Sequence, residues 1–173
     1  MPVGIRVREP SDLDGCVDAL GRVYATGGYP TNWPADPARW LSPSGLIKAW
    51  VASTDDIPVA GHALVSKLPD DVGKTGDGRP AVEFGRLFVA PAARRQGVAQ
   101  VLIRHAKDWA EDHDMDLVLW VTDHLTAART LYASTGFTLA TTEVANWTAP
   151  DGSPVTVHRY DWPQDERCTP QNR

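Results

Sequence analysis

The stretch of sequence that decides the fold is Ala81-Val-Glu-Phe-Gly-Arg-Leu-Phe-Val89, followed by Ala90-Pro-Ala-Ala-Arg94-Arg-Gln-Gly-Val-Ala-Gln100. Its first half is a largely apolar run that predicts a strand over residues 81–89. After a short loop with two arginines, apolar residues recur at helical spacing and predict a helix over residues 97–113. The short, continuously apolar segment 117–121 then predicts a strand covered on both faces. We expect the two strands to be parallel and joined by a right-handed crossover.

The rest of the chain adds strands and helices on both sides of this unit. Alternating or apolar runs predict further strands over 3–9, 47–53, 58–66, 137–147 and 155–162. Helices are predicted between Ser11 and Gly27, after Pro37, and over 127–135. This order predicts an α/β (α+β) fold with a mixed, mostly antiparallel sheet of about seven strands and helices on both faces. It fits a single domain over residues 1–162 and a polar, disordered tail over 163–173.

Composition narrows the class of protein. The chain has 173 residues, a formal net charge of -5 and only two cysteines, Cys16 and Cys168. The acidic balance argues against a nucleic-acid partner, and no apolar run is long enough to span a bilayer, so no membrane partner is expected. Two cysteines allow no disulfide framework, and we expect a cytoplasmic protein without a metal site. Cys16 lies on the apolar stripe of the first helix and is interpreted as a core residue.

The loop between the strand and the helix has the features of an anion site. The first amides of a helix have no partner inside the helix, and the helix dipole favours negative charge there. Gly97 and Ala99 leave the backbone accessible, and Arg94 and Arg95 add positive charge. These features predict a phosphate or pyrophosphate site. The alternative is an ordinary strand-to-helix turn with a solvated pair of arginines.

Two segments resemble signature motifs of the GCN5-related N-acetyltransferase (GNAT) superfamily. Arg94-Arg-Gln-Gly-Val-Ala99 matches its Gln/Arg-x-x-Gly-x-Gly/Ala signature, and Leu131-Tyr-Ala-Ser-Thr-Gly-Phe137 is similar to its Leu-Tyr-x-x-x-Gly-Phe segment. The order of the predicted elements also fits, so the resemblance covers residues 3–162. It implies the acyl-CoA N-acyltransferase (GNAT) fold and acetyl-CoA as the cosubstrate.

The resemblance implies where this cosubstrate binds. The helix start after the signature would hold the coenzyme A pyrophosphate through backbone amides, and the strand before the loop would pair with the pantetheine arm. The implied cofactor-binding residues are Leu87, Phe88, Val89, Arg94, Arg95, Gln96, Gly97, Val98, Ala99 and Gln100. One position departs from the family pattern, because Leu125 stands where members of the family often have an asparagine that binds the pantetheine arm.

The resemblance also implies two catalytic residues. Tyr132 takes the place of the family's general acid, which protonates the departing thiolate, and a phenol is protonated at neutral pH without tuning. Glu83 takes the place of a glutamate that accepts the amine proton, often through water. The alternatives are a core tyrosine and a rim charge paired with Arg86 or Arg6. Weaker candidates for the base are His124, His62 and Glu143.

Aromatic residues between the first helix and the second strand are the candidates for acceptor binding. In the family this segment borders the acceptor cleft, and here it holds Tyr29, Trp33 and Trp40. Such rings can stack on an acceptor or surround an ammonium group. The alternative is that Trp33 and Trp40 cap a small satellite core.

Together these residues predict an N-acetyltransferase that moves the acetyl group of acetyl-CoA directly to a primary amine of a small-molecule acceptor. Direct transfer is favoured because neither cysteine is placed to form a covalent intermediate. The alternatives are a longer acyl-CoA, a protein or peptide amine as the acceptor, and a coenzyme A-binding regulatory module without turnover. Because this fold often dimerises through its last strands, Trp147 and Trp162 are candidates for a homodimer interface.

Overall fold

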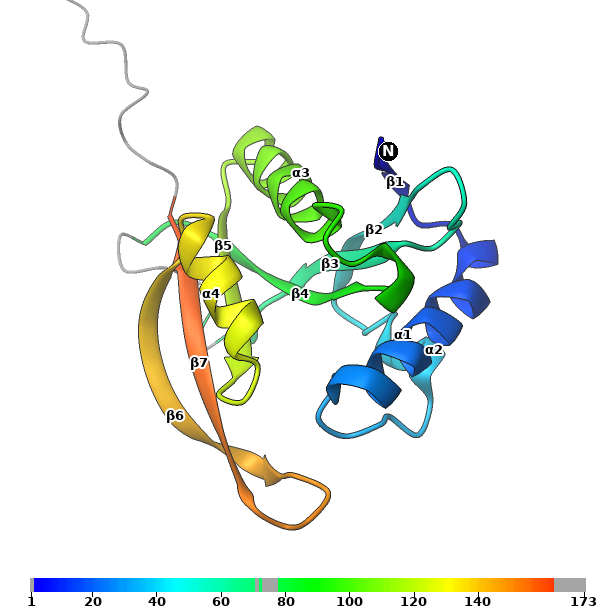
Figure 1. Cartoon of the computed structure of the whole chain (residues 1–173). Helices are drawn as coiled ribbons and strands as arrows, with labels where there is room; N and C mark the ends of the chain where they lie inside the picture. Colours follow the sequence, from blue (N-terminus) through cyan, green and yellow to red (C-terminus); the bar gives the residue numbers. More distant parts are fainter. Residues whose placement is uncertain (1, 71, 73–77, 164–173) are drawn as a thin grey trace, which may run out of the picture.

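The computed structural model describes residues 2–70, 72 and 78–163, and Figure 1 shows a central twisted sheet with helices on both faces. The strands are β1 (Gly4–Val7), β2 (Leu46–Ser53), β3 (Gly61–Lys67), β4 (Ala81–Val89), β5 (Asp116–Thr122), β6 (Thr138–Thr148) and β7 (Pro154–Trp162). The helices are α1 (Leu13–Gly27), α2 (Pro37–Trp40), α3 (Val98–Asp112) and α4 (Thr126–Ser134), with short 3-10 turns η1 (Pro10–Asp12) and η2 (Pro91–Ala93). Cys168 and all of the predicted tail after Pro163 lie outside the described residues.

The seven strands form one sheet in the order β1-β2-β3-β4-β5-β7-β6. Among these described strands, β4 and β5 are the one parallel pair, and every other pair of neighbours is antiparallel. The predicted mixed, mostly antiparallel sheet is therefore confirmed. The strand predicted over 81–89 has its predicted bounds. The strand predicted over 58–66 begins only at Gly61, because residues 58–60 belong to a turn.

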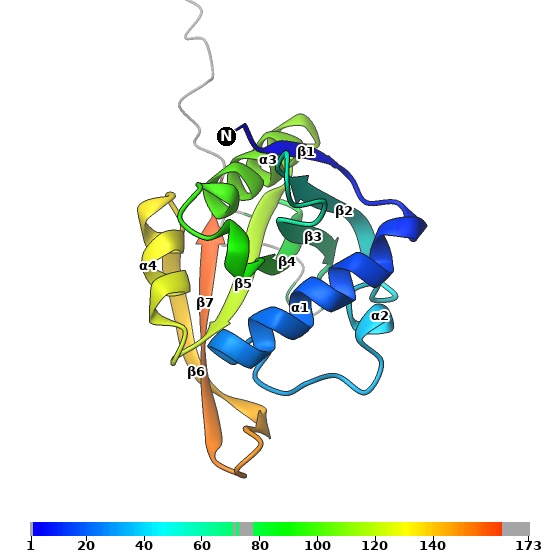
Figure 2. The same cartoon turned by 45° about the vertical axis from the view of Figure 1, so that its right-hand side comes forward.

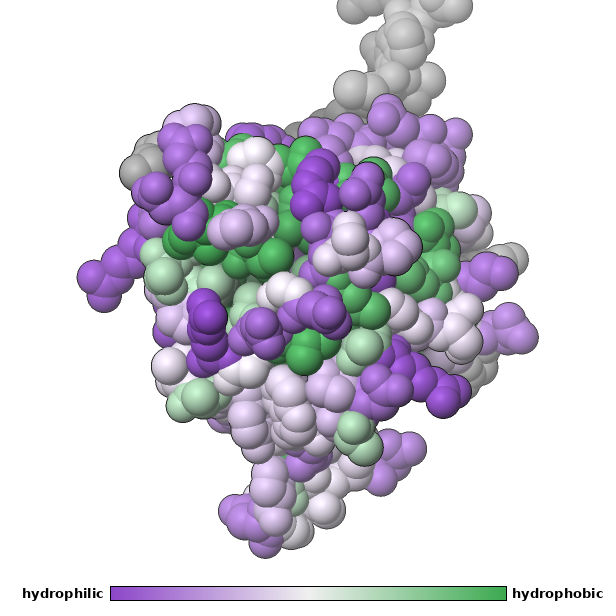
Figure 3. Space-filling model, turned by 90° about the vertical axis from the view of Figure 1, so that its right-hand side faces the viewer, coloured by the Kyte–Doolittle hydropathy of each residue, from purple (hydrophilic) through white to green (hydrophobic). Residues whose placement is uncertain are grey.

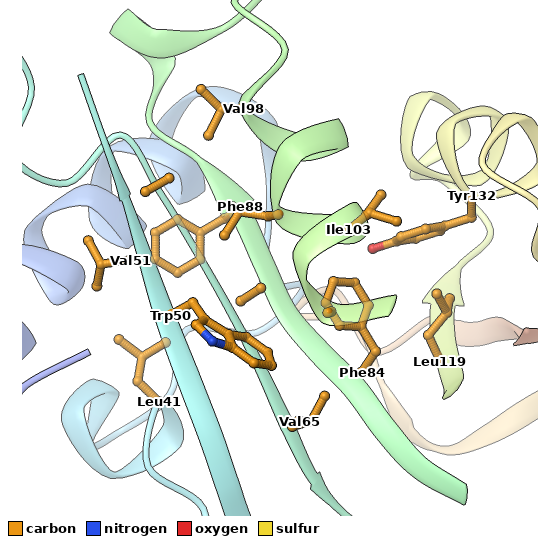
Figure 4. Close-up of a cluster of buried hydrophobic side chains, with 14 of the residues drawn as sticks. Leu41, Trp50, Val51, Val65, Phe84, Phe88, Val98, Ile103, Leu119 and Tyr132 are labelled. Atoms are coloured by element: carbon orange, nitrogen blue, oxygen red, sulfur yellow. The ribbon is translucent and has the colours of Figure 1, made fainter. Parts of the chain in front are cut away.

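Helices α1 and α2 cover one face of the sheet and α3 packs on the other, as Figures 1 and 2 show. The close approach of α3 requires a glycine at position 61, because a Cβ there would lie 2.7 Å from Val98 and 3.0 Å from Leu102. On the same face Trp50 packs edge-on against Trp109 of α3, with ring centroids 6.1 Å apart. Figure 4 shows the buried side chains that fill this core. Burial of each large apolar side chain contributes roughly 1.5–3 kcal/mol and holds β4 in place between the helices.

Strand β4 contains a β-bulge. His62 and Leu64 of β3 are two positions apart, but their partners Phe88 and Gly85 are three positions apart. Arg86 lies within the extra length and has a φ of 52°. The bulge therefore reverses the alternation of side chains along β4. Gly85 and Phe88 point to the same face of the sheet, although an unbroken strand would put them on opposite faces.

Strands β4 and β5 pair only where they begin. Their parallel register runs from Ala81 opposite Asp116 to Glu83 opposite Val118, and β5 continues alone with β7 on its other side. Beyond Glu83, the edge of β4 that faces β5 has no strand partner in the described part of the chain. The sheet is thus split in its middle, and an unpaired edge of this kind is able to bind an extended ligand.

Cys16 is fully buried in α1, as predicted. Burial raises the pKa of its thiol to about 11. Because the nucleophilic form of cysteine is the thiolate, a buried and protonated thiol is inert. The packing role predicted for Cys16 agrees with this environment.

The outer surface on the side of α1 and α2 mixes polar and apolar side chains. Figure 3 shows this side, where green apolar residues form small groups separated by purple hydrophilic ones. Within residues 2–70, 72 and 78–163, no helix has both the length and the apolar character needed to cross a membrane.

Candidate active site

A cavity of about 900 Å³ lies where β4 and β5 part. β4 lines it from Glu83 to Val89, and β5 lines it with residues 120–122. The end of α1, the segment 29–32, Trp40 of α2 and residues of α4 also line this space. Segments that are far apart in the sequence therefore meet around the split in the sheet.

Glu83 lines the cavity at the last β4 position that pairs with β5. Its carboxylate lies beside Gly85, where a Cβ would be in ordinary van der Waals contact with Oε1 at 3.6 Å. Burial raises the pKa of this carboxyl above its ordinary value, and the charge of Arg86 partly opposes the rise. A raised pKa makes the carboxylate a stronger proton acceptor, as a general base requires.

Tyr132 reaches the same cavity from α4. Figure 4 shows its side chain pointing from α4 toward β4, with the hydroxyl group at the inner end. Its ring packs against Phe137 and Tyr160, with centroids 5.7 and 6.4 Å away. Burial raises the pKa of this phenol, so it stays protonated, and able to donate, at neutral pH. The two residues predicted as acid and base thus line one cavity from two different elements.

Arg86, considered in the sequence only as an ion-pair partner, also lines the cavity. Its guanidinium carbon lies 4.1 Å from the centroid of the Trp40 ring. Its Nε donates a hydrogen bond of 3.3 Å to the Trp40 carbonyl oxygen. The stacking and the hydrogen bond hold a permanent positive charge at the wall of the cavity, near the predicted base.

Of the three aromatic residues predicted to bind the acceptor, two line the cavity. Tyr29 and Trp40 do so, with ring centroids 6.0 Å apart. Trp33 does not belong to the lining, is 39% exposed and packs against Tyr24 of α1, with centroids 5.3 Å apart. The structure therefore places Trp33 in surface packing on α1, although Asn32 just before it still lines the cavity.

Two tryptophans that the sequence did not assign to the acceptor side also line the cavity, Trp120 of β5 and Trp147 of β6. Near Trp147, the side chain of Asn32 donates a hydrogen bond of 2.9 Å to the Thr148 carbonyl oxygen. This bond joins the segment after α1 to the β6–β7 hairpin. Its two residues are 116 positions apart, so no local sequence pattern could have indicated the contact.

The predicted anion site forms another part of the same cavity. Arg94 and Ala99 line it, and Arg94 donates a hydrogen bond of 3.3 Å to the Thr26 hydroxyl of α1. Helix α3 begins without a side-chain cap, and Gly97 before it has a φ of 77°, which favours glycine. The amides of the first turn of α3 are thus left without a capping side chain, as a phosphate site requires.

The other residues predicted to bind the cofactor differ in their positions. Residues 87–89 line the cavity. Val98 is 2% exposed and packs in the core. Arg95, Gln96 and Gln100 are exposed and outside the lining. Contacts from the loop to a ligand would therefore come from backbone amides and Arg94 more than from these three side chains.

Two features of the cavity fit the arm of a coenzyme A molecule. The unpaired β4 edge beyond Glu83 offers backbone groups to an extended ligand. The Thr122 hydroxyl oxygen is buried, lies in a lining residue and has no hydrogen-bond partner in the protein. A buried polar atom of this kind calls for a partner, which a bound ligand would supply. Leu125 also lines the cavity, so position 125 offers a ligand no side-chain hydrogen bond, whereas the Thr122 hydroxyl, like His124 and Thr126, is a polar group of the lining.

The weaker candidates for the base lie in three different environments. His124 lines the cavity, whereas Glu143 is exposed on β6 and outside the lining. His62 is fully buried, and both of its ring nitrogens have partners, Arg8 and the Arg86 carbonyl, each at 2.9 Å. His62 is therefore not available to accept a substrate proton.

No group of three or more His, Cys, Asp or Glu residues in the described ranges is arranged to hold a metal ion.

Comparison with known proteins agrees with the motifs. The sequence model of the acetyltransferase (GNAT) family matches residues 18–137, a range that includes both signature segments, β4 and α3. No curated protein matches the chain.

Solved structures share the fold at low sequence identity. A protein provisionally assigned as a phosphinothricin N-acetyltransferase superposes with a TM-score of 0.76 at 18% identity, covering 95% of this chain and 100% of its own. The yncA protein of Salmonella typhimurium, a provisionally assigned acetyltransferase solved with its cofactor acetyl-CoA, gives 0.72 at 18% identity and covers 99% of both chains. The ribosomal-protein-S18-alanine N-acetyltransferase of Escherichia coli gives 0.70 at 20% identity, covering 97% of this chain and 99% of its own. The predicted acyl-CoA N-acyltransferase fold is thereby confirmed.

Proposed function

The chain belongs to the acetyltransferase (GNAT) family, and on that premise we propose that it transfers the acetyl group of acetyl-CoA directly to a primary amine of a small-molecule acceptor. The observation that carries the proposal is the presence of Glu83 and Tyr132 in one cavity at the split between β4 and β5. A partly buried carboxyl and a phenol around one space suit two proton transfers. We assign the reaction to one domain over residues 1–162.

Acetyl-CoA would supply an activated acetyl thioester, and four features of the chain are suited to hold it. The unpaired edge of β4 at residues 87–89 would bind the pantetheine arm, with the Thr122 hydroxyl as a further partner. The start of α3 and the Arg94 guanidinium would bind the pyrophosphate. The yncA structure with acetyl-CoA supports this choice of cosubstrate at the level of the fold.

The chain's own groups would move the protons of the reaction. Glu83 takes a proton from the acceptor ammonium, directly or through water, and leaves the nitrogen with a free electron pair. As the nitrogen forms its bond to the acetyl carbon and the carbon–sulfur bond breaks, Tyr132 donates a proton to the sulfur. The nitrogen loses its second proton, which restores the phenol, and Glu83 returns its own proton to solvent. The products are an amide, a free thiol and one released proton.

The acceptor side of the cavity supports a small molecule. Tyr29 and Trp40 form aromatic walls there, and the hydrogen bond from Asn32 to the Thr148 carbonyl ties the two segments that flank it. A protein acceptor would have to enter between these joined segments. The ribosomal-protein-S18-alanine N-acetyltransferase shares the fold, so peptide amines belong in the test.

The test is incubation with acetyl-CoA and a library of small amines and peptides, with thiol release and product mass as readouts. We expect thiol release with at least one small amine and a product heavier by one acetyl group. The Tyr132→Phe variant should release thiol far more slowly with the same amine. Binding of acetyl-CoA without thiol release from any acceptor would instead indicate a regulatory module, and modification of peptides alone would indicate a protein acceptor.

A second copy of this chain is the partner that we propose for β6. This outer strand is exposed along its length, with Leu139 53% and Val144 68% exposed. An edge strand with apolar side chains is suited to pair with another edge. Of the two tryptophans predicted for the interface, Trp147 lies on β6 itself and is 40% exposed, although it also lines the cavity, whereas Trp162 lies on β7 and packs against the core and Lys107. Light scattering should give twice the chain mass, and Val144→Asp should halve it; the monomer mass at high concentration would contradict the proposal.

A further inference from the structure

The bulge in β4 brings two opposite charges to the same cavity. Glu83 and Arg86 are three positions apart, and regular alternation would place their side chains on opposite faces of the sheet. The bulge between Gly85 and Phe88 cancels that alternation, and both side chains line the cavity. They do not neutralise each other by direct contact, since no ion pair joins them in the described part of the chain.

Arg86 is held in place while most of its hydrogen-bonding capacity stays unused. Trp40 makes both contacts that hold it. The Trp40 ring stacks on the face of the guanidinium, and the Trp40 carbonyl oxygen accepts a hydrogen bond from Nε. No residue in the described ranges accepts a hydrogen bond from its two Nη atoms, which together carry four N–H donors. Arg8 shows the contrast, because its Nη atoms donate to the Leu41 carbonyl and the Ser42 hydroxyl. Arg8 is a structural arginine, whereas Arg86 has donors left for a ligand.

The ligand that fits such a group is an anion with two oxygens in a plane. A guanidinium binds a carboxylate through two parallel N–H···O bonds, and stacking on Trp40 fixes the plane in which those bonds form. Tyr29, whose ring packs against Trp40, lines the same part of the cavity. Arg94 also lines the cavity, but it donates a hydrogen bond to Thr26 and belongs to the loop before α3, where we propose that the pyrophosphate binds.

We propose that the acceptor is an amine that also carries an acidic group, as an α-amino acid does, with Arg86 binding the carboxylate while Glu83 receives the proton of the amine. This inference deepens the proposed N-acetyltransferase function and rests on it. A zwitterionic acceptor places its negative group on the arginine and its ammonium on the carboxylate. A diamine of the same length would put a second positive charge against Arg86, which disfavours its binding.

The experiment compares matched pairs, each an α-amino acid and its decarboxylated amine: methionine with 3-methylthiopropylamine, tyrosine with tyramine, tryptophan with tryptamine, and ornithine with putrescine. Thiol release from acetyl-CoA gives kcat/KM for both members, and the readout is their ratio. Since both members are measured on one preparation, partial misfolding of a variant cancels in the ratio. The variants are Arg86→Gln and Arg86→Lys, and Arg104→Gln, an exposed position on α3 outside the cavity, is the matched control.

We expect the native protein to favour the acid member of at least one pair by about thirtyfold, and Arg86→Gln to reduce that ratio at least tenfold. Arg86→Lys should retain part of the preference, because it keeps the charge but not the planar fork. Arg104→Gln should keep the native ratio. Equal use of both members, or a preference that survives Arg86→Gln, would overturn this inference and leave the N-acetyltransferase function intact. Absence of thiol release with every pair and with the amine library would overturn the proposed function and this inference with it.

Discussion

The Nδ1 atom of His62 on β3 lies 2.9 Å from the carbonyl oxygen of Arg86, within the β4 bulge. Because a carbonyl oxygen only accepts hydrogen bonds, Nδ1 carries the proton, and Nε2 is left to accept from Nη1 of Arg8 at 2.9 Å. Arg8 also donates to the carbonyl of Leu41, the residue after Trp40. One buried neutral histidine thus connects the bulge that carries Arg86 to the segment that carries its stacking partner.

Replacing His62 should separate the hydrogen bond from the volume of the ring. His62→Asn keeps an N–H donor near the place of Nδ1, whereas His62→Leu keeps volume but leaves the Arg86 carbonyl and the Arg8 guanidinium without their partner. We expect His62→Leu to lower the free energy of unfolding by about 2–4 kcal/mol and His62→Asn by about half as much. Urea unfolding measures both, and equal losses would show that the hydrogen bond to the bulge does not matter.

The same histidine should make stability depend on pH. Burial lowers the pKa of His62 from 6.5 to about 4 in the folded protein. Between these values the unfolded chain binds a proton that the folded chain does not. The resulting contribution, roughly 3 kcal/mol, is therefore present above pH 6.5 and lost as the pH falls to about 4. Urea unfolding at several pH values in this window should give a shallower slope for His62→Asn than for the native protein; parallel slopes would contradict the assignment.

Glu83→Gln should reduce activity without loss of stability. Because burial raises the pKa of Glu83 in the folded protein, the unfolded chain gives up this proton more readily, and at neutral pH the ionised carboxylate opposes folding. Glutamine is uncharged, so it removes the cost of burying an ionised carboxylate, and it also removes the proposed proton acceptor. We expect kcat/KM to fall by about 10²-fold or more, with a melting temperature at pH 7 equal to or above the native one.

The matched control for this variant is Glu143→Gln, which removes an exposed carboxylate from β6 outside the cavity. It should leave kcat/KM within a factor of about two. If Glu83→Gln kept the same activity as this control, the base would be another group, with His124 the next to test.

Tyr132→Phe should lower kcat by about 10²-fold while the affinity for acetyl-CoA changes little, because in the proposed reaction the hydroxyl protonates the leaving sulfur. Tyr160→Phe is the control, since Tyr160 is also buried, packs 6.4 Å from Tyr132 and lies outside the cavity lining. Steady-state kinetics and calorimetric titration with coenzyme A separate kcat from binding. Equal effects of the two substitutions would indicate a packing role for Tyr132.

Thr122→Val should leave the protein without ligand at least as stable as the native form, because it removes a buried hydroxyl that has no partner. The shape of the side chain is almost unchanged, so a loss of coenzyme A affinity would report the hydrogen bond alone. We expect the dissociation constant for coenzyme A to rise by about three- to tenfold. An unchanged constant would show that the Thr122 hydroxyl does not contact the bound arm.

The fold and its main elements were predictable because they depend on short, local sequence patterns. Strand β4 was predicted from a short, largely apolar run and α3 from apolar residues at helical spacing, and both elements have nearly their predicted bounds. The motifs around Gly97 and Tyr132 are likewise short, and the fold that they implied is confirmed. The roles of Glu83 and Tyr132 stay predictions, but their presence in one cavity follows from elements that the sequence placed correctly.

Only the tertiary structure decided which residues join Glu83 and Tyr132 in the cavity lining, because each of these features depends on contacts between distant segments. Trp147 lines the cavity through the position of a hairpin that Asn32 holds, and Trp33 turns outward onto Tyr24. The face on which Arg86 lies depends on one extra residue in β4, which the pairing with β3 accommodates. A strand's alternation can be read from its own residues, but a bulge that reverses it is determined by the neighbouring strand. The sequence by itself determined the fold and predicted Glu83 and Tyr132 as the site residues, whereas the bulge decided that Arg86 lines the cavity with them.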